Sequence, residues 1–195
     1  MNIFYLDHDP RKAAEYHCDK HVSKMIVEYG QLMSTAHRMI DGEHTHRLSK
    51  SGSKLQHWIM ESSMLDAELY LPTHFNHPSA KWVRECADNY AWLYNCFKQL
   101  ARVFEYRYGK AHATYTKLRH HLSSPPAAIS RSAKTPIGRA FNANALPHCN
   151  VENDVEAYRR FYVTKRGRMP MIWNKDPNNK PQWFNELCLQ VPELR

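Results

Sequence analysis

Apolar side chains recur at helical spacing along most of this 195-residue chain. Residues 2–6 form a short apolar opening that favours an extended conformation. Asp9 is a suitable helix N-cap and Pro10 suits the first helical position, because the N–H that proline lacks has no partner there. The pattern predicts one helix from Pro10 to about Ile40, ended by Asp41-Gly42.

The same spacing predicts further helices at residues 55–71, 78–108, 111–122 and 152–168. Residues 43–54 are polar and contain Gly and Ser, so we expect a mobile loop. Residues 123–150 are rich in Pro and Ala and lack periodicity. A connection of that length is expected to be either functional or ordered against the core.

These elements predict an all-α fold, a single-domain helical bundle spanning 1–195 with a short extended N-terminal segment and long loops. The last residues are expected to dock on this bundle, because they include Trp173, Trp183 and Phe184. No run of about 18 apolar residues occurs, which argues against a membrane partner. The sequence gives no indication of the oligomeric state.

Charge and cysteine content narrow the function classes. Lys and Arg number 27 against 19 Asp and Glu, so the formal net charge is +8. This balance favours anionic partners, and nucleic acid first. The five cysteines are scattered without a C-x-x-C pair, which argues against both a disulfide framework and a thiolate zinc site.

The first long helix carries a row of polar side chains. At about 100° per residue, they fall within roughly 40° of one line: His17, His21, Lys24, Glu28, Gln31 and Thr35. The row is either a solvated stripe with a Lys24–Glu28 pair or the lining of a cleft. Small residues on a further side, Gly30 among them, allow another helix to pack closely.

In the second interpretation, a partly desolvated Glu28 acts as general acid or base, and His21 orients or polarises the substrate. Lys24 holds a phosphate or lowers the pKa of that carboxyl. His17 and His21 also have a spacing that can chelate zinc, but no third ligand is in register, so we expect neither a metal nor a cofactor.

Cations interleaved with aromatic residues mark the other candidate phosphate-binding positions, since cations bind phosphates and aromatic faces stack on bases. The basic helix at 152–168 is the strongest case; elsewhere, helix capping and solvated charge explain the same residues. Together with His17 and Lys24 of the polar row, the candidates for phosphate binding are Arg84, Arg107, Tyr108, His112, Arg159, Arg160 and Lys165. Of these, Arg159, Arg160 and Lys165 are expected to face the same opening as Glu28.

The trio Asp19, His21 and Glu28 resembles the first helix of the phage pyrimidine-dimer DNA glycosylases of the endonuclease V type. In that family an Asp-x-His precedes the catalytic Glu, which lies seven residues after the His. The resemblance covers about twenty-five residues. It implies an all-α, cofactor-free enzyme whose N-terminal amine attacks C1′ of the sugar. Because Asn2 is too large for efficient removal of the initiator residue, that nucleophile is either the Met1 amine or absent.

Over most of its length the chain also resembles small conserved proteins of tailed phages, through stretches such as "NHPSAKWVRE", "EYRYGK" and "AYRRFY". This resemblance implies the cytoplasm of an infected bacterial host. The preferred hypothesis is a DNA glycosylase or glycosylase-lyase that acts on duplex DNA. The alternatives are a protein that sequesters or cleaves a free nucleotide signal, and an enzyme of phage DNA-base modification.

Overall fold

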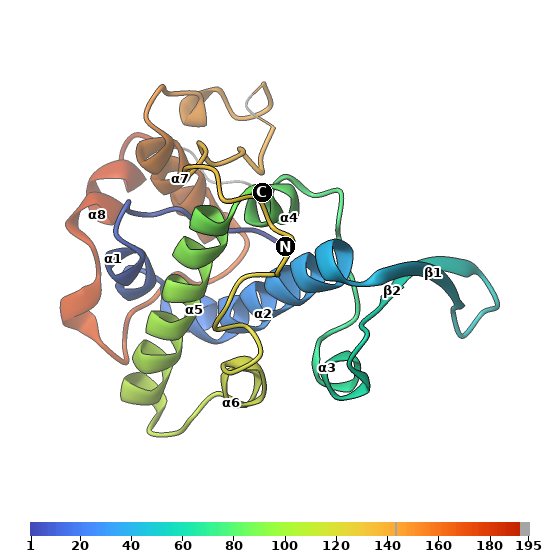
Figure 1. Ribbon diagram of the computed structural model, residues 1–195. Helices are drawn as coiled ribbons and strands as arrows, with labels where there is room; N and C mark the ends of the chain where they lie inside the picture. Colours follow the sequence, from blue (N-terminus) through green and yellow to red (C-terminus); the bar gives the residue numbers. More distant parts are fainter. Residues whose placement is uncertain (143, 192–195) are drawn as a thin grey trace.

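The computed structural model describes residues 1–142 and 144–191, and two long helices lie at its centre. Helix α2 (Asp19–Asp41) packs across α5 (Ala87–Tyr108), as Figure 1 shows. Around this pair lie α1 (Pro10–Glu15), α4 (Pro78–Glu85) and α6 (Ala113–Leu118).

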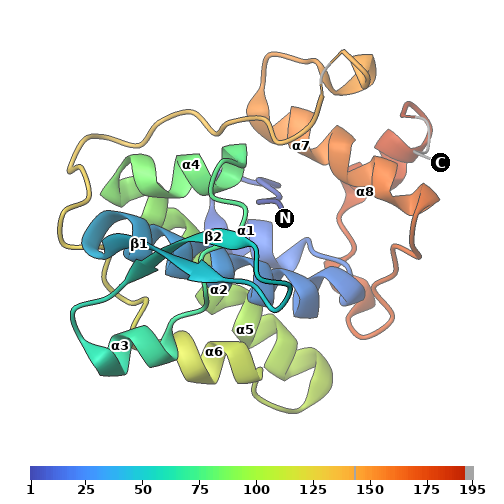
Figure 2. The same cartoon turned by 90° about the vertical axis from the view of Figure 1, so that its right-hand side faces the viewer.

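Helices α7 (Asp154–Val163) and α8 (Gln182–Cys188) pack on each other beside the beginning of α2 (Figure 2). The Tyr162 hydroxyl contacts both Cys18 and His21 there. Trp173 and Phe184 are buried, so the tail docks on the core as expected. The N-terminal segment is also buried at residues 3–6 and runs between α7 and the central helices.

The prediction of an all-α fold is wrong, because β1 (Glu43–Leu48) and β2 (Lys54–Ile59) form an antiparallel hairpin. It projects from the end of α2 (Figure 1). The predicted mobile loop therefore contains a strand, and the predicted helix 55–71 is reduced to α3 (Ser63–Glu68). β1 is polar up to Leu48, and β2 places its apolar residues Leu55, Trp58 and Ile59 on different faces, so neither strand shows the alternating signal that identifies most strands.

Buried Arg38 anchors the base of this hairpin. Its guanidinium donates to the carbonyls of Trp58, Leu69 and Tyr70, and it contacts both the carboxylate and the carbonyl of Asp66. One side chain of α2 therefore ties together carbonyls of β2, of α3 and of the segment that follows α3.

The predicted helix from Pro10 to Ile40 is broken at residues 16–18. The Cys18 backbone is extended, and its N–H donates to the Tyr162 hydroxyl instead of a helical carbonyl. Arg107 takes up the carbonyls of Glu15 and His17. Tertiary partners thus replace the hydrogen bonds that a continuous helix would have made.

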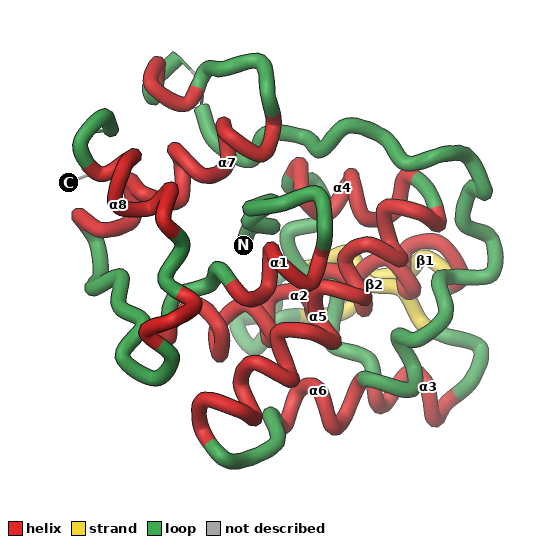
Figure 3. The backbone as a smooth tube through the Cα atoms, turned by 90° about the vertical axis from the view of Figure 1, so that its left-hand side faces the viewer, coloured by secondary structure: helices red, strands yellow, loops and turns green. Residues whose placement is uncertain are grey.

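The predicted helix 78–108 is likewise interrupted, at Cys86, whose backbone is extended. There the N–H of Ala87 donates to the carbonyl of Ser130, from the long connection that follows α6. Figure 3 traces that connection from α6 to α7. It is largely irregular but ordered against the core through buried Ile129 and Ile137; Ala143, within it, lies outside the described residues.

No helix among the described residues is both long and apolar enough to cross a membrane.

Candidate functional site

A pocket of about 490 Å³ opens where the N-terminal segment, α2 and the turn after α7 meet. That volume lies within the range of about 300–1,000 Å³ that is typical of small-ligand sites. Its lining combines charged, aromatic and apolar side chains: Met1, Asn2, Phe4, Lys20, His21, Lys24, Glu28, Ala140, Phe161, Lys165, Arg168 and Met169. The three predicted catalytic positions, Met1, His21 and Glu28, therefore share one pocket.

Glu28 supplies the carboxylate of this pocket, and its side chain is 13% exposed. The backbone N–H of Asn2 donates to Oε2 at 2.9 Å, and the Met1 nitrogen lies 4.0 Å from the same oxygen. Lys24, one helical turn away, places Nζ 3.3 Å from Oε1. The carboxylate is thus largely shielded from water and fixed in orientation by the N-terminal segment.

His21 forms part of the inner wall. Its ring stacks on Phe4, with centroids 4.9 Å apart, and Nδ1 lies 3.0 Å from the Tyr162 hydroxyl. That hydroxyl already accepts from the N–H of Cys18, so its own proton is free for Nδ1. This favours the His21 tautomer that carries its proton on Nε2.

Burial is the main cause that lowers the pKa of His21 to about 2, and the nearby lysines add to it. The imidazole is therefore neutral at physiological pH. It serves as a hydrogen-bonding group in the wall and adds no positive charge.

Four side-chain cations line the pocket together with this carboxylate: Lys20, Lys24, Lys165 and Arg168. Burial first, and then Arg168 and Lys24, lower the pKa of Lys165 to about 8. Lys20 and Arg168 are exposed at the rim, where they are free to meet an incoming ligand. An excess of cations over one carboxylate gives the pocket a field that attracts anions.

Aromatic rings form the apolar part of the lining. Phe161 is buried, and Phe141 stacks on it with centroids 4.6 Å apart. Phe4 lies 6.2 Å from Phe161 and carries His21 on its face. Phe141 and Lys165 already lie over the Phe161 ring and His21 over Phe4, so these rings offer apolar contact beside the cations and not an open face for stacking.

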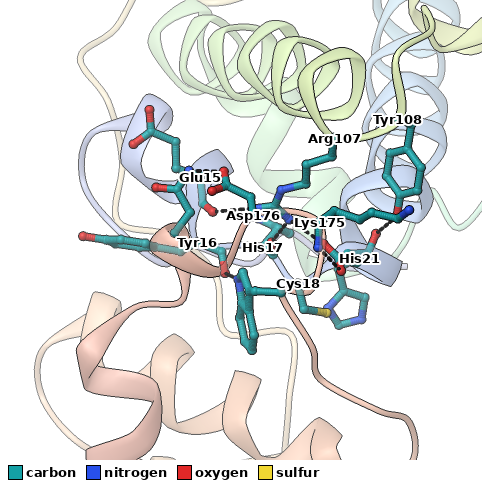
Figure 4. Close-up of polar contacts among 12 residues, drawn as sticks. Glu15, Tyr16, His17, Cys18, His21, Arg107, Tyr108, Lys175 and Asp176 are labelled. Atoms are coloured by element: carbon teal, nitrogen blue, oxygen red, sulfur yellow. Dashed lines mark hydrogen bonds and ion pairs between the residues drawn. The ribbon is translucent and has the colours of Figure 1, made fainter.

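Three predicted phosphate-binding residues lie in a network at the break between α1 and α2 instead of in this pocket (Figure 4). Arg107 reaches from α5 to the carbonyls of Glu15 and His17 and to the Asp19 carboxylate at 3.3 Å. The Tyr108 hydroxyl donates to the carbonyl of Asp19. His17 is fully buried, and burial lowers its pKa to about 4. These groups bind the fold's own backbone, which leaves them unavailable to a ligand.

Other predicted phosphate contacts are also engaged elsewhere. Arg84 donates to the carbonyl of Ala80, and His112 caps α6. Arg160 is paired with Glu156, and its nearest oxygen lies 2.7 Å away. None of the three lines the pocket.

Arg159 likewise lies outside the pocket. It donates to the carbonyl of Leu6 and contacts Asp7, and it lines a different cavity beside α8. Of the three basic residues expected to face the same opening as Glu28, only Lys165 does so.

The structure adds Lys20 and Arg168 to the sequence candidates. Lys20, Lys24 and Glu28 are spaced four residues apart, so helical geometry places Lys20 on the same face, one turn before Lys24. Arg168 carries no such signal, because its position depends on the 3₁₀ turn Thr164–Gly167. The sequence also could not identify Phe4 as a pocket residue, because an apolar N-terminal segment is normally assigned to the core.

In the described ranges, no group of three or more His, Cys, Asp or Glu side chains is arranged to hold a metal ion. The side chains of His17 and His21 have ring centroids 6.5 Å apart, and Nδ1 of each has a partner within the protein.

Comparisons of the chain with models of protein families, with curated protein sequences and with solved structures found no match.

Proposed function

We propose that the chain acts on the C1′–base bond of a nucleotide, as a glycosylase or glycosylase-lyase, with Glu28 as general acid/base. The observation that carries this proposal is the oriented, largely shielded Glu28 carboxylate inside a nucleotide-sized pocket with four cations. A carboxylate in that position stabilises the positive charge that develops at C1′ as the base departs.

The reaction breaks the bond between C1′ and the base nitrogen, and the base leaves with the electron pair and takes up a proton. An oxygen of water or the nitrogen of an amine forms the new bond to C1′. Glu28 accepts the proton that the nucleophile loses and passes it to the departing base. The rim cations Lys20 and Arg168 hold the phosphate, and Phe161 and Phe4 contact the base or sugar.

In duplex DNA the target nucleotide has to leave the base stack before it enters this pocket. The resemblance to phage glycosylases supports DNA as the substrate. The tailed-phage origin and the cytoplasm of an infected host remain predictions of the sequence.

The placement of the basic residues favours a second candidate, which is sequestration of a free nucleotide without cleavage. Arg159 and Arg160 face away from the pocket, so the positive surface around Glu28 is compact. A compact cluster suits one or two phosphates better than a long backbone.

One experiment separates the two candidates. The protein is incubated with duplex DNA containing cyclobutane pyrimidine dimers or uracil, and separately with mono- and dinucleotides. Released base and unchanged ligand are then measured by chromatography. Release of a base that Glu28→Gln abolishes supports the enzyme. Stoichiometric nucleotide binding without release supports sequestration, and neither binding nor release overturns both candidates.

A further inference from the structure

Lys165 is the pocket cation whose surroundings differ most from those of an ordinary lysine. It lies in the 3₁₀ turn Thr164–Gly167, directly after α7, and faces the same pocket as Glu28. Its Nζ lies 3.7 Å from the centroid of the Phe161 ring. The ring face attracts the protonated amine, as in other cation–π contacts, but it offers Nζ no carboxylate and takes no proton from it.

The partners of the pocket amines distinguish Lys165 from the others. The nitrogens of Lys24 and Met1 both lie beside the Glu28 carboxylate. Within the described part of the chain, no carboxylate forms an ion pair with Lys165 and no acceptor forms a hydrogen bond with it. The charges that face it are chiefly the cations Arg168 and Lys24, opposed by the thiol of Cys149.

Burial and these like charges act against the attraction of the Phe161 ring and disfavour the protonated amine. The pKa of Lys165 is lowered to about 8. About a tenth of such an amine is neutral at pH 7, against about 0.04% of a lysine with an ordinary pKa. The neutral amine is the nucleophilic form.

We propose that Lys165 is the amine nucleophile of this site and that it forms an imine with the C1 carbon of a phosphorylated sugar. For base release this rests on the proposed function. Nζ attacks C1′, the base departs with the electron pair of its bond, and Nζ loses a proton to Glu28. Glu28 passes that proton to the base. Opening of the sugar ring then breaks the C1′–O4′ bond: O4′ keeps the electron pair and takes up the remaining Nζ proton by way of Glu28. A C1′=N bond to Lys165 is left, which water later hydrolyses.

The imine step is testable without any base release. The open-chain form of 2-deoxyribose 5-phosphate carries an aldehyde at C1 and a phosphate for the rim cations. An amine and this aldehyde give an imine and one water, and cyanoborohydride reduces the C=N bond to a stable secondary amine. The modified residue then gains the mass of the sugar phosphate less one oxygen atom.

The protein is incubated with 2-deoxyribose 5-phosphate and cyanoborohydride, digested, and mapped by mass spectrometry. The expected result is one predominant adduct on Lys165, which competing inorganic phosphate reduces. A predominant adduct on Met1, Lys20 or Lys24, an even distribution over surface lysines, or no adduct would each overturn the proposal.

Matched variants complete the test. Lys165→Arg keeps the positive charge and should lose the adduct, whereas Lys110→Arg changes an exposed lysine at the end of α5 and should keep it. Thermal unfolding of both variants shows whether each is folded. An adduct of undiminished yield in folded Lys165→Arg would reject the proposal.

This result is independent of the proposed function. Trapping on Lys165 without base release from any nucleotide would reject the glycosylase and leave an imine-forming site for phosphorylated aldehydes. Base release with trapping on Met1 would support the glycosylase and reject Lys165 as its nucleophile.

Discussion

The backbone N–H of Asn2 donates a hydrogen bond to Oε2 of Glu28 at 2.9 Å, although 26 positions separate the two residues. A backbone donor survives any substitution of Asn2 other than proline. The contact also draws the N-terminal segment over α2, where it closes one side of the pocket. The orientation of the Glu28 carboxylate is therefore a property of the fold.

Glu28→Gln tests the role of this carboxylate. The amide oxygen of Gln can still accept from Asn2, so the shape of the pocket is kept and proton transfer is lost. We expect base release to fall by about 10²-fold or more, while nucleotide binding stays within about tenfold. Single-turnover rates and equilibrium titrations measure the two effects separately.

Glu105→Gln is the matched control, because Glu105 is exposed on α5 and lies outside the pocket lining. It should release base at the parent rate. An active Glu28→Gln variant would remove the general acid/base from the proposed function.

Helical geometry was enough to group Glu28, His21 and Lys24, because they share one continuous helix. It does not extend to residues whose position is set by tertiary contacts. Arg107 belongs to another helix and reaches the break before α2, where it binds backbone carbonyls. A basic side chain near a helix end has the same sequence signal whether it binds phosphate or the protein itself.

The sequence also predicted the ends of the helices better than the breaks within them. The N-cap Asp9 and the left-handed Gly109 at the end of α5 both act as their residue types indicate. The extended backbone at Cys18 depends on Tyr162, which is 144 positions away, and no local pattern reports such a partner. The hairpin was missed because β1 is mainly polar and the apolar residues of β2 do not alternate with polar ones.

Buried neutral histidines make stability depend on pH. Burial is the main cause that lowers the pKa of His17 to about 4, of His21 to about 2 and of His37 to about 4. Unfolding restores a pKa near 6.5, so below that pH the unfolded chain binds protons that the folded chain excludes. Stability is thus fully present above about pH 6.5 and is lost as the pH falls toward 4.

Urea titrations at a series of pH values measure this loss. Each histidine contributes a slope of up to about 1.4 kcal/mol per pH unit. His17→Gln should reduce the slope, whatever its effect on stability at pH 7. A free energy of unfolding that stays constant from pH 7 to pH 5 would contradict the prediction.

Gly30 allows α6 to approach α2 closely, which agrees with the small residues on that side of the helix. A Cβ at position 30 would lie 3.0 Å from methyl carbons of both Leu118 and Thr114. In Gly30→Ala, the gain in helix propensity offsets the crowding, and we expect a change within about 1 kcal/mol. Gly30→Val adds two methyl groups and should lower the free energy of unfolding by about 2–3 kcal/mol. Equal stability of the two variants would show that α6 shifts to accommodate the larger side chain without loss of free energy of unfolding.

The last prediction separates the pocket cations from the basic helix. Arg168 is exposed at the rim of the pocket, whereas Arg160 is paired with Glu156 and lies outside the lining. If DNA enters at the pocket, Arg168→Ala removes one phosphate contact and lowers the slope of log K against log salt by about one. Arg160→Ala should leave that slope unchanged.

If the ligand is a free nucleotide, Arg168→Ala should also weaken binding, but the slope of log K against log salt should already be shallow in the parent protein. Binding of a short duplex and of a dinucleotide, titrated over a range of salt concentrations, measures all three proteins. A slope reduced by Arg160→Ala and unaffected by Arg168→Ala would place the DNA contacts on α7 and reject the pocket as the nucleic-acid site.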